Sequence, residues 1–276
     1  MKIQYLGTAA AEGWPGIFCN CPVCREAVRR GGKNIRSRSQ ALVDDSLLID
    51  FPPDSYYHMI QYHVPMAAVQ NILLTHAHQD HFYPLDLTMR GNGFSDEVTG
   101  ILQIYGNELC CEWFGEAVRT ASPYMELDRR LAFHTITKFQ TLNLQGYTIT
   151  PLPALHDRRQ NCLIYLLEKD GKKLLYGNDT GWFPDETWRF LEREGHLDGV
   201  SLDCTMGRQK EGTNHMGIPD NREVIKRLKL YGCVNSDTKI VITHFSHHGG
   251  VLHEEMEQEV GTDGWYVAYD GFCLEI

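Results

Sequence analysis

Short apolar runs recur along the chain and are separated by polar, turn-forming segments. Runs of this kind are typical of strands, and they predict strands over Lys2–Leu6, Leu47–Phe51, Ile72–Thr75, Leu102–Tyr105, Lys239–Thr243 and Trp265–Tyr269. Two further runs, Cys162–Leu167 and Lys172–Tyr176, flank Lys169-Asp170-Gly171, where Asp-Gly favours a tight hairpin turn. The first of these two runs is apolar without alternation, so we expect it to be buried on both faces.

Segments with helical features lie between these strands. The range Pro219–Tyr231 begins with proline and is followed by Gly232, which are common start and stop signals of a helix. Asn107–Ala121 and Pro184–Glu194 have similar patterns, with Asn107 as the expected N-cap. Strands predominate in both halves with helices between them, which favours a layered α/β sandwich over a helix bundle or an all-β barrel.

The composition is that of an ordinary globular protein. A chain of 276 residues with 42% apolar and 22% charged residues excludes disordered and low-complexity classes and suits one domain. We therefore expect a single domain over residues 1–276, in which the less regular segment of about 91–140 is a candidate lid. No apolar stretch reaches the ~18 residues of a membrane helix, and the first residues lack a signal-peptide pattern. We expect a soluble, cytoplasmic protein without a membrane partner.

The charge balance narrows the choice of partners. The chain has 26 basic and 36 acidic residues, a net charge of −10. A net-negative surface disfavours broad nucleic-acid binding, which needs a cationic footprint. It does not exclude a phosphate ester at a metal site, because bound cations reverse the local field.

One cluster of metal-capable residues directly follows an expected strand. The run Ile72–Thr75 leads into HAHQDH, which places His76, His78, Asp80 and His81 within six positions. On an extended chain His76 and His78 point the same way, and a following helical turn would bring Asp80 and His81 to the same space. The alternative is a polar loop of exposed histidines, which four such residues after a buried strand disfavour.

The stretch THAHQDH resembles the signature of the metallo-β-lactamase superfamily, whose fold is a four-layer αββα sandwich. The resemblance implies further ligands at strand ends, and His156, Asp179 and His244 each follow such a strand in the family's order. It implies a first metal held by His76, His78 and His156, a second held by Asp80, His81 and His244, and Asp179 as the bridging ligand. Such ligands suit zinc, manganese or iron. The family's di-iron redox members carry Glu where this chain has His78, so hydrolysis is favoured.

A second candidate metal site lies near the N-terminus. The stretch CNCPVC brings Cys19, Cys21 and Cys24 within reach of one tetrahedral zinc, with His247 or His248 as the fourth ligand. The alternative is three buried cysteines that act as small apolar side chains, which the loop spacing disfavours. The other cysteines lie in apolar runs and are expected in the core: Cys110, Cys111, Cys162, Cys204, Cys233 and Cys273.

Together, GTAAAEGWPGIFCNCPVC and THAHQDH resemble a narrower group, the phosphoribosyl 1,2-cyclic phosphate phosphodiesterases of phosphonate breakdown. This resemblance implies two divalent active-site ions, manganese or zinc, and one structural zinc. It also implies a small cyclic phosphodiester substrate. Our hypothesis for the chemistry is that a metal-bridging hydroxide, oriented by Asp80 and Asp179, attacks phosphorus. The group's Asn-His pair corresponds to Asn214-His215, with His215 as a catalytic residue or, alternatively, a surface histidine.

Other functions stay open on the same scaffold. A tRNA 3′-processing endonuclease would need an arm for tRNA, and the chain has neither a Gly-Pro-rich insertion nor a basic cluster. Lactonase or thioesterase activity is a further alternative, because the same hydroxide attacks carbonyl groups. A non-catalytic pathway protein resembling pyrroloquinoline-quinone biosynthesis protein B has a similar N-terminal pattern, but that family generally lacks an intact HxHxDH. No motif marks the substrate-specificity residues or the oligomeric state, so a homo-oligomer stays open.

Overall fold

Two seven-stranded sheets form the centre of the computed structural model, which describes all 276 residues. The first sheet has the spatial order β14 (Phe272–Glu275), β1 (Lys2–Gly7), β2 (Gln40–Val43), β3 (Leu47–Ile49), β4 (Asn71–Leu73), β5 (Leu102–Gly106), β6 (Leu131–Thr135). The second has the order β13 (Tyr266–Val267), β12 (Lys239–Thr243), β11 (Gly199–Asp203), β10 (Lys172–Gly177), β9 (Leu163–Lys169), β8 (Tyr147–Pro153), β7 (Leu142–Leu144). The two ends of the chain, in β1 and β14, pair with each other in the first sheet.

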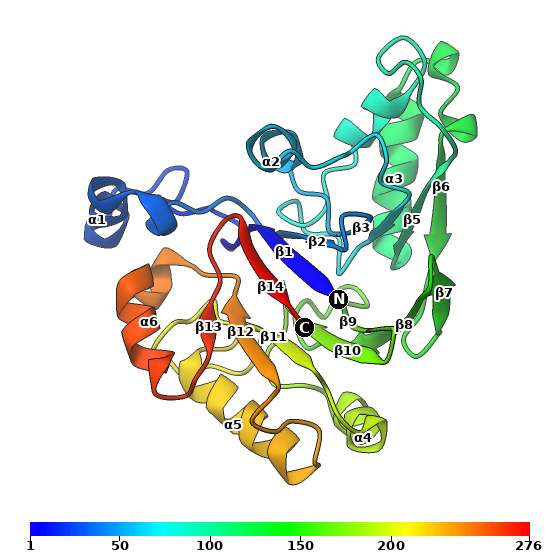
Figure 1. The fold of residues 1–276 in the computed structure, drawn as a ribbon. Helices are drawn as coiled ribbons and strands as arrows, with labels where there is room; N and C mark the ends of the chain where they lie inside the picture. Colours follow the sequence, from blue (N-terminus) through cyan, green and yellow to red (C-terminus); the bar gives the residue numbers. More distant parts are fainter.

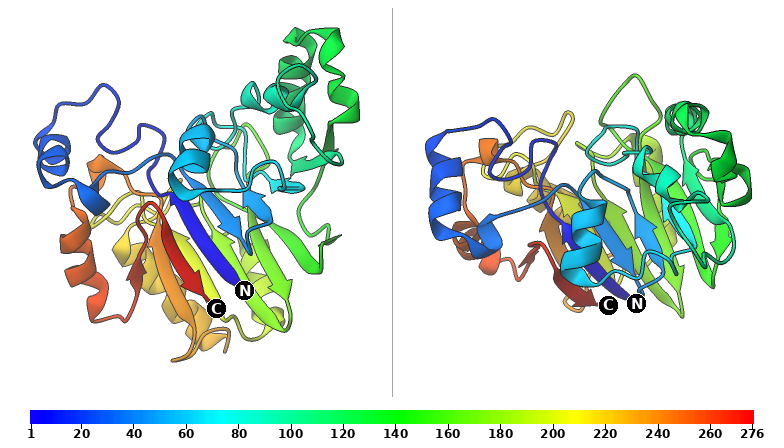
Figure 2. Two further views of the ribbon diagram at one scale, coloured as in Figure 1. Left: turned by 45° about the horizontal axis from the view of Figure 1, so that its top comes forward. Right: turned by 90° about the horizontal axis from the view of Figure 1, so that it is seen from above.

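Six helices lie outside the two sheets: α1 (Pro22–Arg30), α2 (Ser55–Tyr62), α3 (Glu108–Thr120), α4 (Asp185–Glu194), α5 (Ile218–Leu230) and α6 (His253–Gly261). Helices α2 and α3 cover the outer side of the first sheet, and α4, α5 and α6 cover the outer side of the second (Figure 1). The four-layer αββα sandwich expected from the sequence is therefore confirmed. Helix α1 and the loop before it extend to one side, next to α6 (Figure 2).

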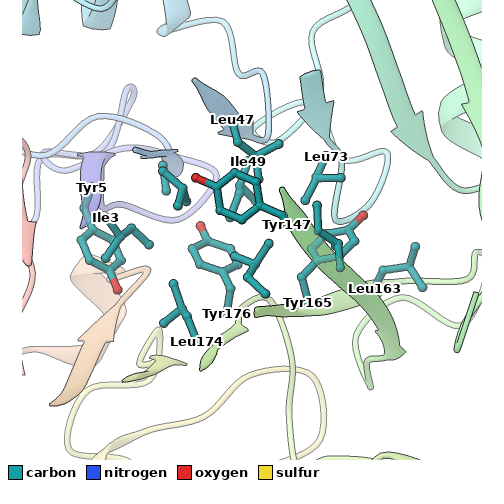
Figure 3. Close-up of a cluster of buried hydrophobic side chains, with 14 of the residues drawn as sticks. Ile3, Tyr5, Leu47, Ile49, Leu73, Tyr147, Leu163, Tyr165, Leu174 and Tyr176 are labelled. Atoms are coloured by element: carbon teal, nitrogen blue, oxygen red, sulfur yellow. The ribbon is translucent and has the colours of Figure 1, made fainter. Parts of the chain in front are cut away.

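The main core lies between the facing sheets. It is a cluster of 19 buried residues with side chains from both sheets, among them Tyr5 and Leu47 from the first and Tyr165 and Tyr176 from the second (Figure 3). The Tyr165 hydroxyl donates to the carbonyl oxygen of Leu74 at 2.5 Å. This bond joins the second sheet to the chain just beyond β4, at the start of the HAHQDH segment.

Several local predictions are confirmed. A tight hairpin joins β9 and β10, and both of its central residues have the positive φ of a type I′ turn, 51° at Asp170 and 72° at Gly171. The first five residues of β9 are fully buried, as the continuous apolar run predicted. The Asn107 side chain accepts from the backbone N–H of Cys110 at 2.9 Å and so caps α3.

Two details differ from the sequence-based expectation for the cysteines. Cys273 is exposed and Cys111 is only half-buried, so the prediction that both belong to the core is wrong. Cys273 lies on β14 at the edge of the first sheet, where alternate side chains face solvent.

The candidate lid segment contains β5, β6 and α3, and a lid function for any part of it stays a prediction.

The strand directions gather the predicted ligands at one edge. Strands β3, β4 and β5 run parallel to one another, as do β10, β11 and β12. Strand β8 points the same way as β10, because both are antiparallel to β9 between them. Carboxyl ends of such strands meet at the same edge of a sheet.

None of the helices has the length and apolar character needed to span a membrane.

Candidate metal centres

The first cluster consists of three histidines from two loops. His76 and His78 follow β4, His156 follows β8, and one ring nitrogen of each lies within 4.8 Å of the others. The ring centroids are 4.4 Å apart for His76 and His78 and 4.8 Å apart for His76 and His156. The structure thus brings together the three residues predicted for the first metal.

The chain after β4 takes a different path from the expected strand and helix. Strand β4 ends at Leu73, before the histidines, and HAHQDH forms a single turn rather than a helix. In this turn the backbone amides of His81 and Phe82 both donate to the carbonyl oxygen of His78, at 2.9 and 2.8 Å. The turn carries His81 back beside His76, with 4.4 Å between the ring centroids.

The second cluster contains Asp80, His81, Asp179 and His244, all of them buried and with ligand atoms within 4.8 Å of one another. Asp179 lies between this cluster and the first. Its Oδ1 is 3.0 Å from His244 Nε2, and its Oδ2 is 3.0 Å from His81 Nε2. The same Oδ2 is 4.0 Å from His76 Nε2 and 3.9 Å from His156 Nε2. A carboxylate in this place is positioned to serve both clusters.

Each of the five imidazoles donates its outward N–H to a protein oxygen. The acceptors are Thr75 Oγ1 for His76 (3.0 Å), Asp157 Oδ2 for His78 (3.1 Å), Asp50 Oδ2 for His81 (2.7 Å), Asn214 O for His156 (3.1 Å) and Thr205 Oγ1 for His244 (2.8 Å). The hydroxyl of Thr75 gives its own proton to Asp50, and that of Thr205 gives its proton to the His244 carbonyl. The two threonine oxygens therefore accept from the histidines.

These outer bonds leave the inner ring nitrogens with their lone pairs facing one another. His81 Nε2 and His244 Nε2 are 3.2 Å apart, and His78 Nδ1 and His156 Nε2 are 3.1 Å apart. Two lone pairs at such a distance need a proton or a cation between them. His76 Nε2 is buried and has no hydrogen-bond partner. Imidazole and carboxylate donors backed by outer oxygens suit zinc, manganese or iron, so these residues fit two divalent cations.

The pKa shifts in the second cluster also indicate a site for cations. Burial disfavours a charge on His81, but Asp179, Asp80 and Asp50 surround it and raise its pKa well above the usual value. Burial likewise opposes a charge on Asp179, and His244 and His81 outweigh it and hold the pKa of this carboxyl well below its usual range. Without metal the cluster offsets its negative charge with protons, and bound cations would take the place of these protons.

His215 lies beside both clusters. Its ring centroid is 4.8 Å from that of His156 and 5.6 Å from that of His244. Its Nδ1 donates to Oδ2 of Asp203 at 2.8 Å, a fully buried carboxylate at the end of β11. Burial acts to lower the pKa of His215, but Asp203, with smaller contributions from Asp179 and Glu211, raises it to about 9. The predicted catalytic histidine is thus placed at the cluster and held by an acid.

The acids that orient these rings were not identified from the sequence. Asp50 and Asp203 each end an apolar strand, in LLID and VSLD, just as His76 and His244 follow LLT and VIT. A single acid at the end of a buried strand was a usable signal for both. Asp50 has a positive φ of 67° and His244 one of 61°, a rare backbone state for residues other than glycine and one found at functional sites.

A separate cluster of three cysteines and one histidine lies where the N-terminal loop and the start of α1 meet the segment after β12. Ligand atoms of Cys19, Cys21, Cys24 and His247 lie within 4.8 Å of one another, and the cysteines form no disulfide. His247 Nδ1 is 3.8 Å from Cys19 Sγ and 3.6 Å from Cys21 Sγ. Bonds of about 2.3 Å to sulfur and 2.1 Å to nitrogen in a tetrahedral zinc site separate such atoms by roughly 3.6 Å. His247, rather than the exposed His248, completes the set.

Local bonds shape this loop around the thiols. Cys21 caps α1, and its Sγ accepts from the backbone N–H of Cys24 at 3.4 Å, which lowers the pKa of the Cys21 thiol. Burial raises the pKa of the Cys24 thiol to about 12. A Cβ on Gly16 would lie 3.1 Å from Cys19 Cβ and 3.3 Å from His247 Cδ2, so the loop packs closely. The four residues fit a closed structural zinc site.

Residues 47–245 match the family model of the β-lactamase superfamily domain. The chain belongs to the metallo-β-lactamase superfamily. Among curated relatives, coenzyme PQQ synthesis protein B of Acinetobacter baumannii is 25% identical over 324 residues, and the match covers all of both chains. The corresponding protein of Methylobacterium radiotolerans is also 25% identical, over 310 residues and all of both chains.

Several solved structures share the fold of the whole chain. A diphosphatase from the PhnP family superposes with a TM-score of 0.74 at 21% identity, covering 100% of this chain and 97% of that one. Zinc-bound PqqB from Methylobacterium extorquens gives 0.71 at 20% identity, with full coverage of both chains. The short form of human tRNase Z gives 0.68 at 16% identity, covering 100% of this chain and 99% of that one.

Proposed function

We propose that the protein is a metal-dependent phosphodiesterase that opens cyclic phosphodiesters of ribose. The observation that carries this proposal is the arrangement around Asp179: two clusters of ring nitrogens and carboxylates meet at this residue, and His215 lies beside them with Asp203 behind it. Two cations at such a site would stabilise the charge of a phosphoryl group and lower the pKa of a bound water from 15.7 towards about 7.

The side chains divide the remaining work. His76, His78 and His156 would hold one cation, Asp80, His81 and His244 the other, and Asp179 would contact both. Asp80 and Asp179 would also accept hydrogen bonds from the attacking water and so fix its direction.

His215 would complete the reaction as the acid. Its Nδ1 donates to Asp203 at 2.8 Å, which would leave the Nε2 proton available to the departing group. The attacking water would give one proton to the solvent as its oxygen adds to phosphorus. The P–O bond to a ribose oxygen would break, that oxygen would take the proton from His215 Nε2, and His215 would regain a proton from the solvent. The product is a ribose phosphate monoester.

A second candidate function follows from the curated relatives. The full-length matches to coenzyme PQQ synthesis protein B support a role in a biosynthetic pathway without phosphodiester hydrolysis. Against it stands the complete set of imidazole and carboxylate ligands, with every outer ring nitrogen bonded. The fold likeness to human tRNase Z allows an RNA substrate as well, but the net charge of −10 disfavours one.

An activity profile tests the proposal. Purified protein loaded with Mn²⁺ or Zn²⁺ is assayed with bis(p-nitrophenyl) phosphate, a ribose 1,2-cyclic phosphate, a lactone, a thioester and a tRNA precursor. We expect turnover of the two diesters, fastest for the cyclic one, and no turnover by an Asp179→Asn variant. A folded preparation with two ions at the His/Asp clusters that hydrolyses neither diester would contradict the proposal.

Metal analysis separates the second candidate from the first. The phosphodiesterase should bind three ions per chain, one at the cysteines and two at the histidines. A single zinc, lost in a Cys21→Ser variant, would favour the pathway protein.

A further inference from the structure

A short loop, residues 211–216, contacts the predicted metal ligands with two neighbouring residues. Its His215 side chain lies beside both clusters, and the carbonyl oxygen of the preceding Asn214 accepts from His156 Nδ1 at 3.1 Å. One group of this loop therefore orients a predicted metal ligand, and the next supplies the proposed acid. Any shift of the loop would move both.

The Glu211 side chain holds this loop from within. Its Oε2 accepts from three successive backbone amides, those of Thr213 (3.1 Å), Asn214 (3.2 Å) and His215 (3.1 Å). Its Oε1 accepts from the Thr213 hydroxyl. Successive amides that point at one spot form a nest of the kind that binds anions, and here the carboxylate of the same loop fills it.

The loop also rests on the segments that carry the ligands. The backbone amide of Trp182 donates to Gly212 O at 2.8 Å, and that of Gly181 donates to Leu155 O at 2.7 Å. A Cβ on Gly181 would lie 2.5 Å from Gly212 O, so only glycine allows this approach. Gly181 is two residues beyond Asp179, and Leu155 directly precedes His156. A shift of the loop would therefore pass, through these backbone contacts, to the segments that carry Asp179 and His156.

We propose that Glu211 is a positioning residue: by gathering the amides of residues 213–215 it sets the place of His215 and the orientation of His156. The part that concerns His215 rests on the proposed phosphodiesterase function, whereas the part that concerns His156 does not. Glu211 belongs to neither ligand cluster, so it acts mainly through the geometry of the loop, with a smaller direct effect of its charge on the pKa of His215.

The kinetic test compares two leaving groups. A p-nitrophenolate departs without a proton, whereas a ribose alkoxide needs one, so only the second depends on His215. For Glu211→Ala we expect kcat on the ribose diester to fall about 10²-fold and kcat on bis(p-nitrophenyl) phosphate less than about threefold, with KM little changed on both. Glu211→Gln keeps an acceptor oxygen for the amides and should restore most of the loss. Glu223→Gln, at an exposed position nearby on α5, is the matched control.

A double variant makes the test stricter. In a His215→Ala background, Glu211→Ala should add no further discrimination between the two leaving groups, because the group that it positions is gone. Additive losses, or equal losses on both substrates, would overturn the role of Glu211 toward His215. If Glu211→Ala does not fold, the pair Glu211→Asp and Glu211→Gln carries the comparison, with Asp too short to reach all three amides.

Metal titration keeps the inference testable even if no phosphodiester is hydrolysed. Loss of the Asn214 carbonyl from its place should weaken binding of one of the two Zn²⁺ ions at the His/Asp clusters about tenfold, as outer contacts of ligating histidines typically do. Competition with a chromogenic chelator measures this directly. A Glu211→Ala protein with unchanged affinity at both sites would overturn the role of Glu211 toward His156, whatever the activity profile shows.

Discussion

The histidine–aspartate clusters take their side chains from the ends of β4, β8, β10 and β12, four strands of two packed sheets. The cysteine cluster takes three ligands from the N-terminal loop and the first turn of α1, and only His247 from the segment after β12. At the first site the sheets hold the ligands in place, and buried acids such as Asp50 orient the rings. At the second site the loop and α1 already pack on the sandwich through Trp14, Cys24 and Ala27, and Arg30 pairs with Glu254 and Glu255 of α6. The ion would add one more tie between these segments.

This difference separates chemistry from stability. A site built on strand ends keeps its shape without metal, so its ions can be exchanged or take part in a reaction. A closed site of thiolates, which keeps its ion permanently, contributes its binding free energy to folding. The two are not independent, because His244 and His247 lie three residues apart on one segment.

The largest expected effect is a loss of activity at the two histidine–aspartate clusters, which we call the strand-end site. Asp179→Asn should lower kcat/KM on a phosphodiester by at least about 10³-fold, because the shared carboxylate contacts ligands of both clusters. The melting temperature should change little, and the cysteine zinc should stay bound by elemental analysis. The exposed Asp237→Asn serves as the control. Activity within tenfold of the wild type would show that Asp179 does not join the clusters.

A substitution in the cysteine cluster should instead lower stability much more than activity. Cys21→Ser should remove one zinc per chain and about 3 kcal/mol of stability, a drop in melting temperature of roughly 6–12 °C. Activity should fall only modestly, through the link from His247 to His244. Cys273→Ser, at an exposed cysteine, should change neither quantity. Unchanged zinc content in the Cys21 variant would show that the thiols are not a metal site.

A comparison within the strand-end site sharpens the account further. Asp50→Asn should weaken binding of the ion at Asp80, His81 and His244 by up to about 100-fold, since Asp50 is fully buried and orients His81. Asp157→Asn should weaken binding at His78 only about tenfold, because that histidine is partly exposed and water can replace the acceptor. Chelator competition gives both affinities, and the reverse order would contradict this ranking.

Low pH should lower the stability of the fold independently of the metal sites, because His58 is buried without a charge. Burial lowers the pKa of His58 to about 4, while its Nδ1 donates to Gln40 Oε1. The unfolded chain takes up a proton near pH 6.5 that the folded chain refuses, so stability falls as the pH drops below 6.5 and the loss levels off near pH 4. Between pH 8 and pH 5 the loss should be about 2 kcal/mol. Denaturant melts of wild type and His58→Gln should show a flatter profile for the variant, and equal profiles would contradict this assignment.

The sequence was sufficient for most of the fold and for the ligand clusters, because both depend on strands. A buried strand leaves an unmistakable apolar run, and the residue after it has a known place at the sheet edge, as with His76, Asp179 and His244. The same logic extends to Asp50 and Asp203. It fails for Asp157 and Glu211, whose contacts depend on how irregular loops fold back on themselves. No local pattern predicts that Glu211 binds the amides of its own loop.

Stepwise chelation tests the central distinction most directly. Metal content and melting temperature are measured together while a mild carboxylate chelator, and then a thiol-reactive reagent, removes the ions. We predict that the first step removes two ions per chain and all phosphodiesterase activity with little change in melting temperature. The second step should remove one zinc and lower the melting temperature by roughly 6–12 °C. A protein that unfolds when the first two ions leave, or that keeps its activity without them, would contradict the account.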